Sequence, residues 1–155
     1  MTLRYRKSPR LKDFEYEGAY AYFVTIVTRA RHRAFILPRH AHIALAALHE
    51  SLSKQQFTAH AYCLMPDHLH LLVSGTATSR LTDFVHHLKT ISGYRYKQAA
   101  RRPLWQISYH DHVLRREEAI GDVARYIWEN PLRAGLAEDW TSYPFSGPRP
   151  FPECS

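Results

Sequence analysis

The feature that most constrains the fold is a pair of neighbouring apolar segments joined by only two residues. Residues 57–65 (FTAHAYCLM) and 68–74 (HLHLLVS) are rich in side chains that favour β-strands. Pro66 and Asp67, which separate them, form a pair typical of turns. We therefore expect two antiparallel strands connected as a hairpin, and the rest of the chain has to be built around it.

Further elements flank this hairpin on both sides. Apolar periodicity and strand-forming composition predict a strand over 19–29, a helix over 39–54, a helix capped by Ser79 or Thr82 and running to about residue 100, a strand over 104–115, and a helix over 116–130 that opens with Glu117 and Glu118. The predicted order is β-α-β-β-α-β-α. Its first six elements match an α+β, ferredoxin-like (RRM-like) fold, an antiparallel sheet with helices packed on it.

Length and composition limit the classes of protein that fit. The 155 residues, 45% of them hydrophobic, predict one folded domain over 1–155, with a basic arm over 1–14 and an irregular tail over 132–155. The net charge of +7 favours an anionic partner such as a nucleic acid. Cys63 and Cys154 are the only cysteines, and no signal peptide or membrane-spanning stretch is visible. We expect a soluble cytoplasmic protein without a membrane partner.

The hairpin carries two histidines where a buried strand would normally be apolar. Side chains in a strand alternate between faces, so His68 and His70 point to the same side and could bind one divalent metal. The competing interpretation is accidental spacing in a chain that holds 11 histidines. Two ligands are too few for a closed zinc site, so an open, exchangeable metal fits better. A second His-x-His pair, His110 and His112, lies in a polar context, and we expect no metal role for it.

Later in the chain, the sequence RYIWENP supplies further groups with suitable chemistry. Tyr126 and Asn130 are four residues apart, so in one helix they would share a face. The amide oxygen of Asn130 is a hard ligand, which together with two imidazoles suits Mg²⁺ or Mn²⁺. Pro131 biases Asn130 towards the helix end. The competing interpretation of Tyr126 is a half-buried packing aromatic.

These motifs resemble those of a known family. PDHLHLLV, the segment LWQISYHDHVLR and YIWENPLRAGL, in this order, are similar to motifs of the single-tyrosine transposases of the His-hydrophobic-His endonuclease superfamily, and most closely to the REP-associated tyrosine transposases. The resemblance implies cleavage and rejoining of single-stranded DNA at hairpins of palindromic repeats, through a 5′-phosphotyrosine intermediate. By position, it makes His68, His70 and Asn130 metal ligands and Tyr126 the nucleophile.

Several side chains are candidates for supporting this chemistry. An unperturbed phenol has a pKa near 10, so a nearby cation has to help it ionise, and the metal and Arg125 are candidates. Candidate DNA contacts are Arg4, Arg6, Lys7 and Arg10 in the basic arm, and Tyr94 and Arg95 near the end of the second helix. Trp105 and Gln106 either pack in the core or meet DNA.

Two other classes of protein remain open at this stage. A non-catalytic nucleic-acid-binding module could use the same fold and would stack bases on its sheet. A metal-dependent hydrolase could use the same histidines with water in place of Tyr126. The sequence also leaves open whether the protein is a monomer or a homodimer.

Overall fold

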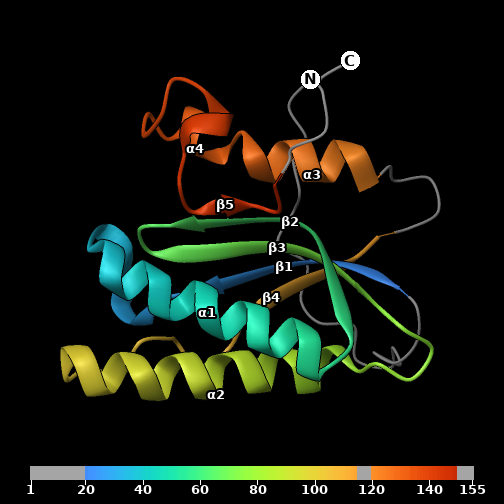
Figure 1. Ribbon diagram of the computed structural model, residues 1–155, viewed down its shortest axis with the longest axis horizontal. Coiled ribbons are helices and arrows are strands. Elements are labelled where there is room, and N and C mark those ends of the chain that lie inside the picture. The colour runs from blue at the N-terminus through green and yellow to red at the C-terminus, as the bar shows by residue number, and fades with distance from the viewer. Residues whose placement is uncertain (1–19, 115–119, 150–155) are drawn as a thin grey trace.

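The computed structural model describes residues 20–114 and 120–149, which form one antiparallel sheet covered on both faces (Figure 1). The strand order is β4-β1-β3-β2-β5, and its first four strands have the order of a ferredoxin-like sheet. The predicted fold class is therefore confirmed. The elements are β1 (Ala21–Val27), α1 (Pro38–Lys54), β2 (Phe57–Met65), β3 (His68–Gly75), α2 (Leu81–Ala100), β4 (His110–Val113), α3 (Ile120–Trp128), α4 (Asn130–Arg133) and β5 (Ser146–Gly147), with short 3-10 turns at Arg29–Arg31, Ala34–Ile36 and Trp140–Ser142.

The hairpin forms as predicted and its turn is attached to the end of β1. Met65 of β2 pairs with His68 of β3, so Pro66 and Asp67 are the two connecting residues. The main-chain carbonyl of Asp67 accepts hydrogen bonds from the amide of Thr28 at 3.0 Å and from its hydroxyl at 3.1 Å. The turn and the end of β1 are thus held together, which fixes the start of β3.

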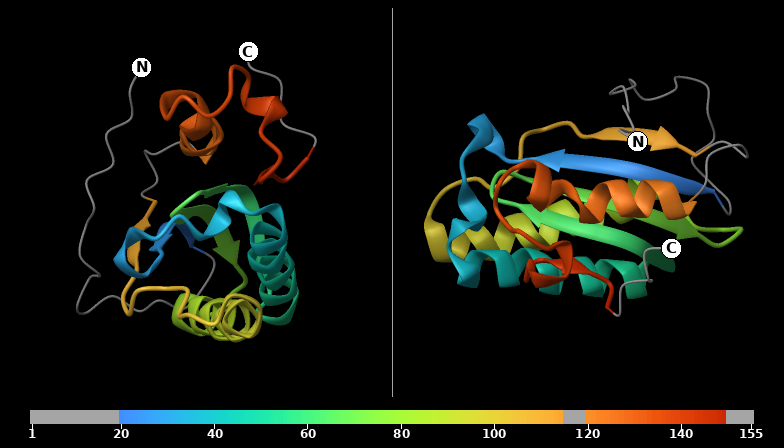
Figure 2. Two further views of the ribbon diagram at one scale, coloured as in Figure 1. Left: turned by 90° about the vertical axis from the view of Figure 1, so that its left-hand side faces the viewer. Right: turned by 90° about the horizontal axis from the view of Figure 1, so that it is seen from above.

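Alternation along β3 divides the molecule into two layers. Leu69, Leu71 and Val73 belong to the larger core under α1 and α2. Leu72 belongs to a second core under α3, and the pairing of β3 places His68 and His70 on that same face. Figure 2 shows α3 on one side of the sheet and α1 with α2 on the other. The histidines therefore face the helix that carries Tyr126.

The strand predicted over 104–115 is much shorter in the structure, because its pairing with β1 is interrupted. Thr25 pairs with His110, and continuing that register would bring Thr28 opposite Ile107. Thr28 instead pairs with Trp105, so two extra residues bulge out of the ladder. Ile107, within this bulge, is 91% exposed.

The boundaries of the two later helices also differ from those predicted. Neither Ser79 nor Thr82 caps α2, because the cap position is Arg80 and it makes no side-chain cap bond. Glu117 and Glu118 lie outside the described residues. The last predicted helix ends at Trp128, and a separate short helix, α4, begins at Asn130 with the following proline in its first turn.

The tail was predicted to be irregular, but part of it extends the sheet. Ser146 and Gly147 form β5, which pairs with Cys63 and Tyr62 at the edge of β2. A Cβ at Gly147 would lie 2.6 Å from the hydroxyl of Tyr62, so only glycine fits here without displacing that ring. The indole of Trp128 in α3 donates a hydrogen bond to the carbonyl of Gly147 at 2.7 Å. The tail therefore ties α3 to the sheet.

Candidate active site

The two histidines of β3, His68 and His70, lie side by side at the end of the strand that follows the hairpin turn. Their ring centroids are 4.6 Å apart, and both side chains are partly buried. The Nδ1 of His68 donates to the carboxylate of Asp67 at 2.7 Å, and the Nδ1 of His70 is hydrogen-bonded to the hydroxyl of Thr25 at 2.9 Å. Because Nδ1 is engaged in both rings, Nε2 is the nitrogen of each that could bind a metal.

Asp67 is a site residue that sequence reasoning treated only as part of a turn. Besides His68, its carboxylate contacts Arg31 at 3.4 Å. Burial by itself would raise the pKa of Asp67, but the hydrogen bond and charge of His68 and the charge of Arg31 outweigh it and lower the pKa below its ordinary value. Asp67 is thus held as an anion that fixes the orientation of the His68 ring. Its place directly before the first histidine was the available signal.

Asn130 reaches the histidines although it does not lie on the same continuous helix as Tyr126. Its side-chain Nδ2 is 3.5 Å from Nε2 of His68. Rotation of this amide by 180° would present Oδ1 to the same position. The prediction that Tyr126 and Asn130 share one helix face is wrong in detail, because α3 ends at Trp128.

The donor set fits an open site for a hard divalent cation. Two imidazole nitrogens and one amide oxygen supply three neutral donors, which leaves further positions for water or phosphate oxygens. Within residues 20–114 and 120–149, no group of three or more His, Cys, Asp or Glu side chains could hold a metal ion. A closed zinc or carboxylate site is therefore not formed by these residues. His110, which pairs with Thr25 on the same face, does not add a third ligand to such a group.

Tyr126 lies on the same face as the histidines, with one aromatic ring between them. Its ring centroid is 6.1 Å from that of Phe23, which in turn is 5.4 Å from the ring of His70. The guanidinium of Arg133 lies over the Tyr126 ring, 4.1 Å from its centroid, and donates a hydrogen bond to the Tyr126 carbonyl. Arg133, which the sequence did not suggest, is therefore a cation in contact with the phenol ring, and a role for Arg125 stays a prediction. The sequence did not reveal this contact of Arg133, because helical spacing from Tyr126 no longer applies beyond the end of α3.

The predicted DNA contacts are distributed differently. Tyr94 is 67% exposed on α2, on the face of the sheet opposite the histidines. Arg95 donates hydrogen bonds to both carboxylate oxygens of Glu50, and this bond lowers the pKa of Glu50. A contact of Tyr94 or Arg95 with DNA stays a prediction. The remaining predicted DNA contacts lie in the basic arm, outside the described part of the chain: Arg4, Arg6, Lys7 and Arg10.

The fold and the site define a ferredoxin-like domain that presents paired histidines, an asparagine and a tyrosine on one face of its sheet. The family model described as "Transposase IS200 like" matches residues 18–130, and the chain belongs to this family. Membership places the chain among the transposases, a class of DNA-cleaving enzymes. The family resemblance inferred from the motifs is thereby confirmed.

Three individual proteins are similar to this chain. A Haemophilus influenzae protein described as a REP-associated tyrosine transposase is 24% identical over 147 residues, which cover 87% of this chain and 82% of that protein. A solved structure of a REP-associated tyrosine transposase bound to a REP hairpin has a TM-score of 0.73 and 18% identity, and the match covers 90% of this chain and 82% of the other. A crystal structure of a transposase from Deinococcus radiodurans has a TM-score of 0.56 and 25% identity, over 76% of this chain and 95% of the other.

Of the helices in the described ranges, 20–114 and 120–149, none combines the length and the apolar composition needed to cross a bilayer.

Proposed function

We propose that this protein cleaves and rejoins single-stranded DNA at or near REP-type hairpins, with Tyr126 as the nucleophile. The observation that carries the proposal is that Tyr126, the two histidines and Asn130 lie on one face of the sheet, with Asn130 next to His68 and only the ring of Phe23 between Tyr126 and His70. Support also comes from the family and from the REP-associated relatives. The substrate class follows from those relatives, one of which is a structure with a bound REP hairpin.

In this mechanism the phenol oxygen of Tyr126 attacks the scissile phosphorus. The P–O3′ bond breaks, which leaves a free 3′-OH on one strand end and a 5′-phosphotyrosine on the other. Because the covalent link conserves the energy of the phosphodiester bond, a second 3′-OH can reverse the step without ATP. The partly buried position of Tyr126 between α3 and the sheet limits its freedom, which favours in-line attack from a fixed direction.

His68, His70 and Asn130 would hold the divalent metal, Mg²⁺ or Mn²⁺. When bound, the metal would polarise an oxygen of the scissile phosphate and stabilise the charge that develops there. Asp67 and Thr25 keep the two imidazoles in place through their Nδ1 atoms, so that both Nε2 atoms are presented in one orientation.

Arg133 helps to hold the ring of the proposed nucleophile in place. Its guanidinium covers the Tyr126 ring and is itself positioned by Glu129, 3.9 Å away on the preceding turn. A cation over an aromatic ring is attracted to its negative face, and this contact limits the directions in which the Tyr126 hydroxyl can point. The hydrogen bond from Arg133 to the Tyr126 carbonyl also holds α4 against the end of α3.

The test is the Tyr126→Phe variant, incubated with a labelled single-stranded palindromic hairpin and Mg²⁺ or Mn²⁺ and analysed on denaturing gels. We expect the wild type to give cut DNA and a protein–DNA adduct, and the variant to lose both by at least about a thousandfold while it still binds the hairpin. Tyr20→Phe, which removes a hydroxyl from an exposed tyrosine directly before β1, is the matched control and should cut normally.

The same experiment separates the two other classes of protein. If Tyr126→Phe still cuts, water is the nucleophile and the protein is a hydrolase. If the wild type binds the hairpin and cuts nothing with either metal, the protein is a binding module. His68→Ala should reduce metal-dependent cutting by at least about a hundredfold with the fold intact, and normal cutting by that variant would remove the metal assignment.

A further inference from the structure

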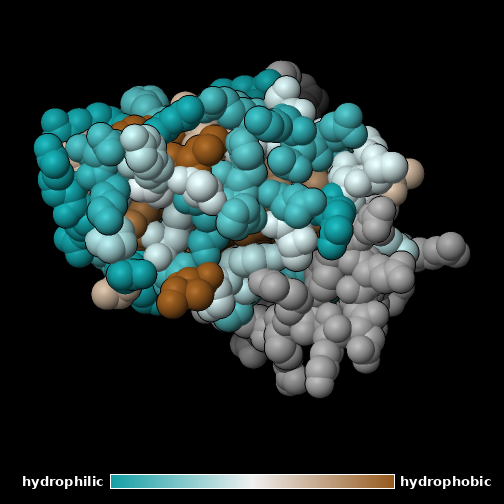
Figure 3. All heavy atoms as spheres, turned by 90° about the horizontal axis from the view of Figure 1, so that it is seen from below, coloured by the Kyte–Doolittle hydropathy of each residue, from teal (hydrophilic) through white to brown (hydrophobic). Residues whose placement is uncertain are grey.

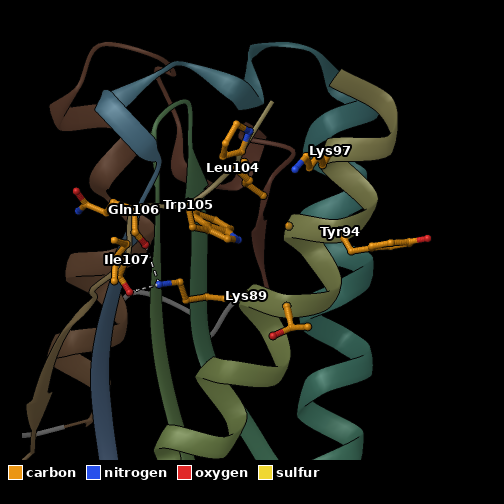
Figure 4. A pocket seen from close by; sticks show the side chains of 10 residues that line it. Lys89, Tyr94, Lys97, Leu104, Trp105, Gln106 and Ile107 are labelled. Carbon is orange, nitrogen blue, oxygen red and sulfur yellow. Dashed lines mark hydrogen bonds between the residues drawn. The ribbon is translucent and has the colours of Figure 1, made fainter. Parts of the chain in front are cut away.

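A cavity lies on the side of the sheet opposite the histidines, between α2 and the segment 103–107 (Figure 4). Its volume is about 370 Å³, within the range of roughly 300–1,000 Å³ that is usual for small-molecule sites. Pro103, Leu104 and Trp105 form its apolar wall, and Gly93 of α2 leaves room opposite the indole. The cavity is shallow and widely open to solvent, so it suits one planar group that belongs to a longer molecule.

Residues 103–107 were predicted to be mostly part of a strand, but in the structure they are attached to α2. The cavity lies between this segment and α2. The indole of Trp105 donates to Ser92 of α2 at 2.8 Å, which anchors one end of the segment. The ammonium group of Lys89 donates to the carbonyls of Gln106 and Ile107, both at 2.8 Å, which anchors the other (Figure 4). Between these two attachments the wall of the cavity is fixed before any ligand binds, which lowers the entropic cost of binding.

The charges around the cavity favour an anionic ligand. Its ten lining residues include Lys89 and Lys97 and no aspartate or glutamate. Lys97 lies at the end of the cavity next to Leu104 (Figure 4). Two segments meet at this end, because the amide of Arg29 donates to the carbonyl of Leu104 and Nη1 of Arg102 lies 3.3 Å from Nε2 of His32. These segments carry five exposed arginines, here called the arginine ridge, which are Arg29, Arg31, Arg33, Arg101 and Arg102.

The arginine ridge connects the cavity to the candidate active site. At one side, Arg31 contacts Asp67, the partner of His68. At the other side, the amide of Arg29 donates to the carbonyl of Leu104 in the cavity wall at 2.9 Å. No carboxylate within residues 20–114 and 120–149 pairs with the side chain of Arg29, Arg33 or Arg101, so positive charge on the ridge is largely unneutralised.

The surrounding surface argues against a protein partner at this place. Figure 3 shows the underside of the molecule, where hydrophobic side chains appear as separate spots in a mostly hydrophilic surface. A protein-binding face would present a larger continuous apolar patch. A small apolar pocket beside a row of arginines is instead the combination that binds a base together with its neighbouring phosphates.

We propose that this cavity binds one unpaired nucleobase of the single-stranded DNA substrate, while the phosphates between that base and the cleavage site lie along the arginine ridge. The inference rests on the proposed DNA-cleaving function, since it assigns this pocket to the same DNA strand. The base would lie against the exposed side chains of Pro103 and Ile107, because Leu104 and Trp105 are almost fully buried and present only an edge. Lys97 would contact the phosphate of the bound nucleotide.

The experiment measures DNA binding in the Tyr126→Phe background without metal, so that no cutting is needed. The probe is a fluorescein-labelled oligothymidine of about 20 nucleotides, and affinity is measured by anisotropy. Lys97→Glu should weaken binding by at least about tenfold, and Lys54→Glu by less than about threefold. Lys54→Glu makes the same change of charge at the opposite end of the helical layer. Tyr96, which precedes Lys97, packs on His40 at the start of α1, whereas Lys54 is the last residue of α1.

A second variant tests the pocket without changing charge. A Cβ at Gly93 would meet Trp105 at 4.0 Å, so Gly93→Leu places a side chain in the cavity in ordinary contact. Oligothymidine that carries 5-iododeoxyuridine should cross-link on irradiation to a peptide from 89–107, and Gly93→Leu should reduce this cross-link at least about fivefold. Unfolding midpoints of all variants show whether each one folds. If Gly93→Leu does not fold, Lys97→Glu provides the test of the cavity.

Failure of this inference differs from failure of the proposed function. Equal losses of affinity in Lys97→Glu and Lys54→Glu, or cross-links that map outside 89–107, would overturn the nucleobase site even if wild-type protein forms the tyrosine adduct. If no adduct forms but both pocket variants lose affinity and cross-linking as expected, the nucleobase site stands and the cleavage mechanism falls.

Discussion

Replacement of Asp67 by alanine tests whether the orientation of His68 matters for the metal. The carboxylate of Asp67 accepts a 2.7 Å hydrogen bond from Nδ1 of His68 and contacts Arg31 at 3.4 Å. The substitution removes both contacts. It leaves the turn itself in place, because the two bonds from Thr28 go to the main-chain carbonyl of residue 67.

The expected magnitude follows from the place of Asp67 behind a metal ligand. Loss of a partner that orients a ligating histidine weakens metal affinity by about 10- to 100-fold, or about 1.4–2.7 kcal/mol. The fold should lose less, about 1 kcal/mol, because the side chains of Asp67 and Arg31 are 25% and 58% exposed and water screens the pair. A large effect on metal affinity with a small effect on stability is therefore the expected signature.

The assay is formation of the covalent DNA adduct as a function of Mn²⁺ concentration. For Asp67→Ala the midpoint of this titration should rise by about 10- to 100-fold, with full adduct recovered at saturating metal. Asp83→Ala, a substitution in the first turn of α2, is the control and should leave the midpoint unchanged. An unaltered midpoint in Asp67→Ala, with His68→Ala still inactive, would refute the assigned orienting role.

Three further outcomes follow from individual contacts. Arg133→Met should slow adduct formation by about tenfold at saturating metal while Arg133→Lys retains most of the rate, as measured by single-turnover gels, because the cation over the Tyr126 ring is lost only in the first. Ser92→Ala should lower the free energy of unfolding by about 1–3 kcal/mol in urea titrations, because the buried indole of Trp105 loses its acceptor. Burial raises the pKa of Cys63 to about 12, so its thiol should stay protonated and unreactive to iodoacetamide from pH 7 to 9 in the folded protein. Peptide mapping that found Cys63 alkylated would contradict its packing under α3.

Much of the fold could be predicted from local patterns. The two-residue connection at Pro66 and Asp67 determined the hairpin, and the spacing of apolar residues determined the helices that became α1 and α2. These predictions succeeded because strand and helix periodicities depend on backbone geometry within a few residues. The predicted strand over 104–115 failed because a bulge against β1 depends on how Trp105 packs under the sheet.

The site was determined in part by the sequence and in part only by the tertiary structure. Alternation in β3 by itself placed His68 and His70 on one face, whatever the rest of the chain does. The sequence could not decide that Arg133 covers Tyr126, since the chain bends between α3 and α4 and helical spacing no longer applies across the break. The periodicity of side chains along a helix or strand is a property of that segment alone. The direction in which one segment meets another is instead set by packing between residues far apart in the chain.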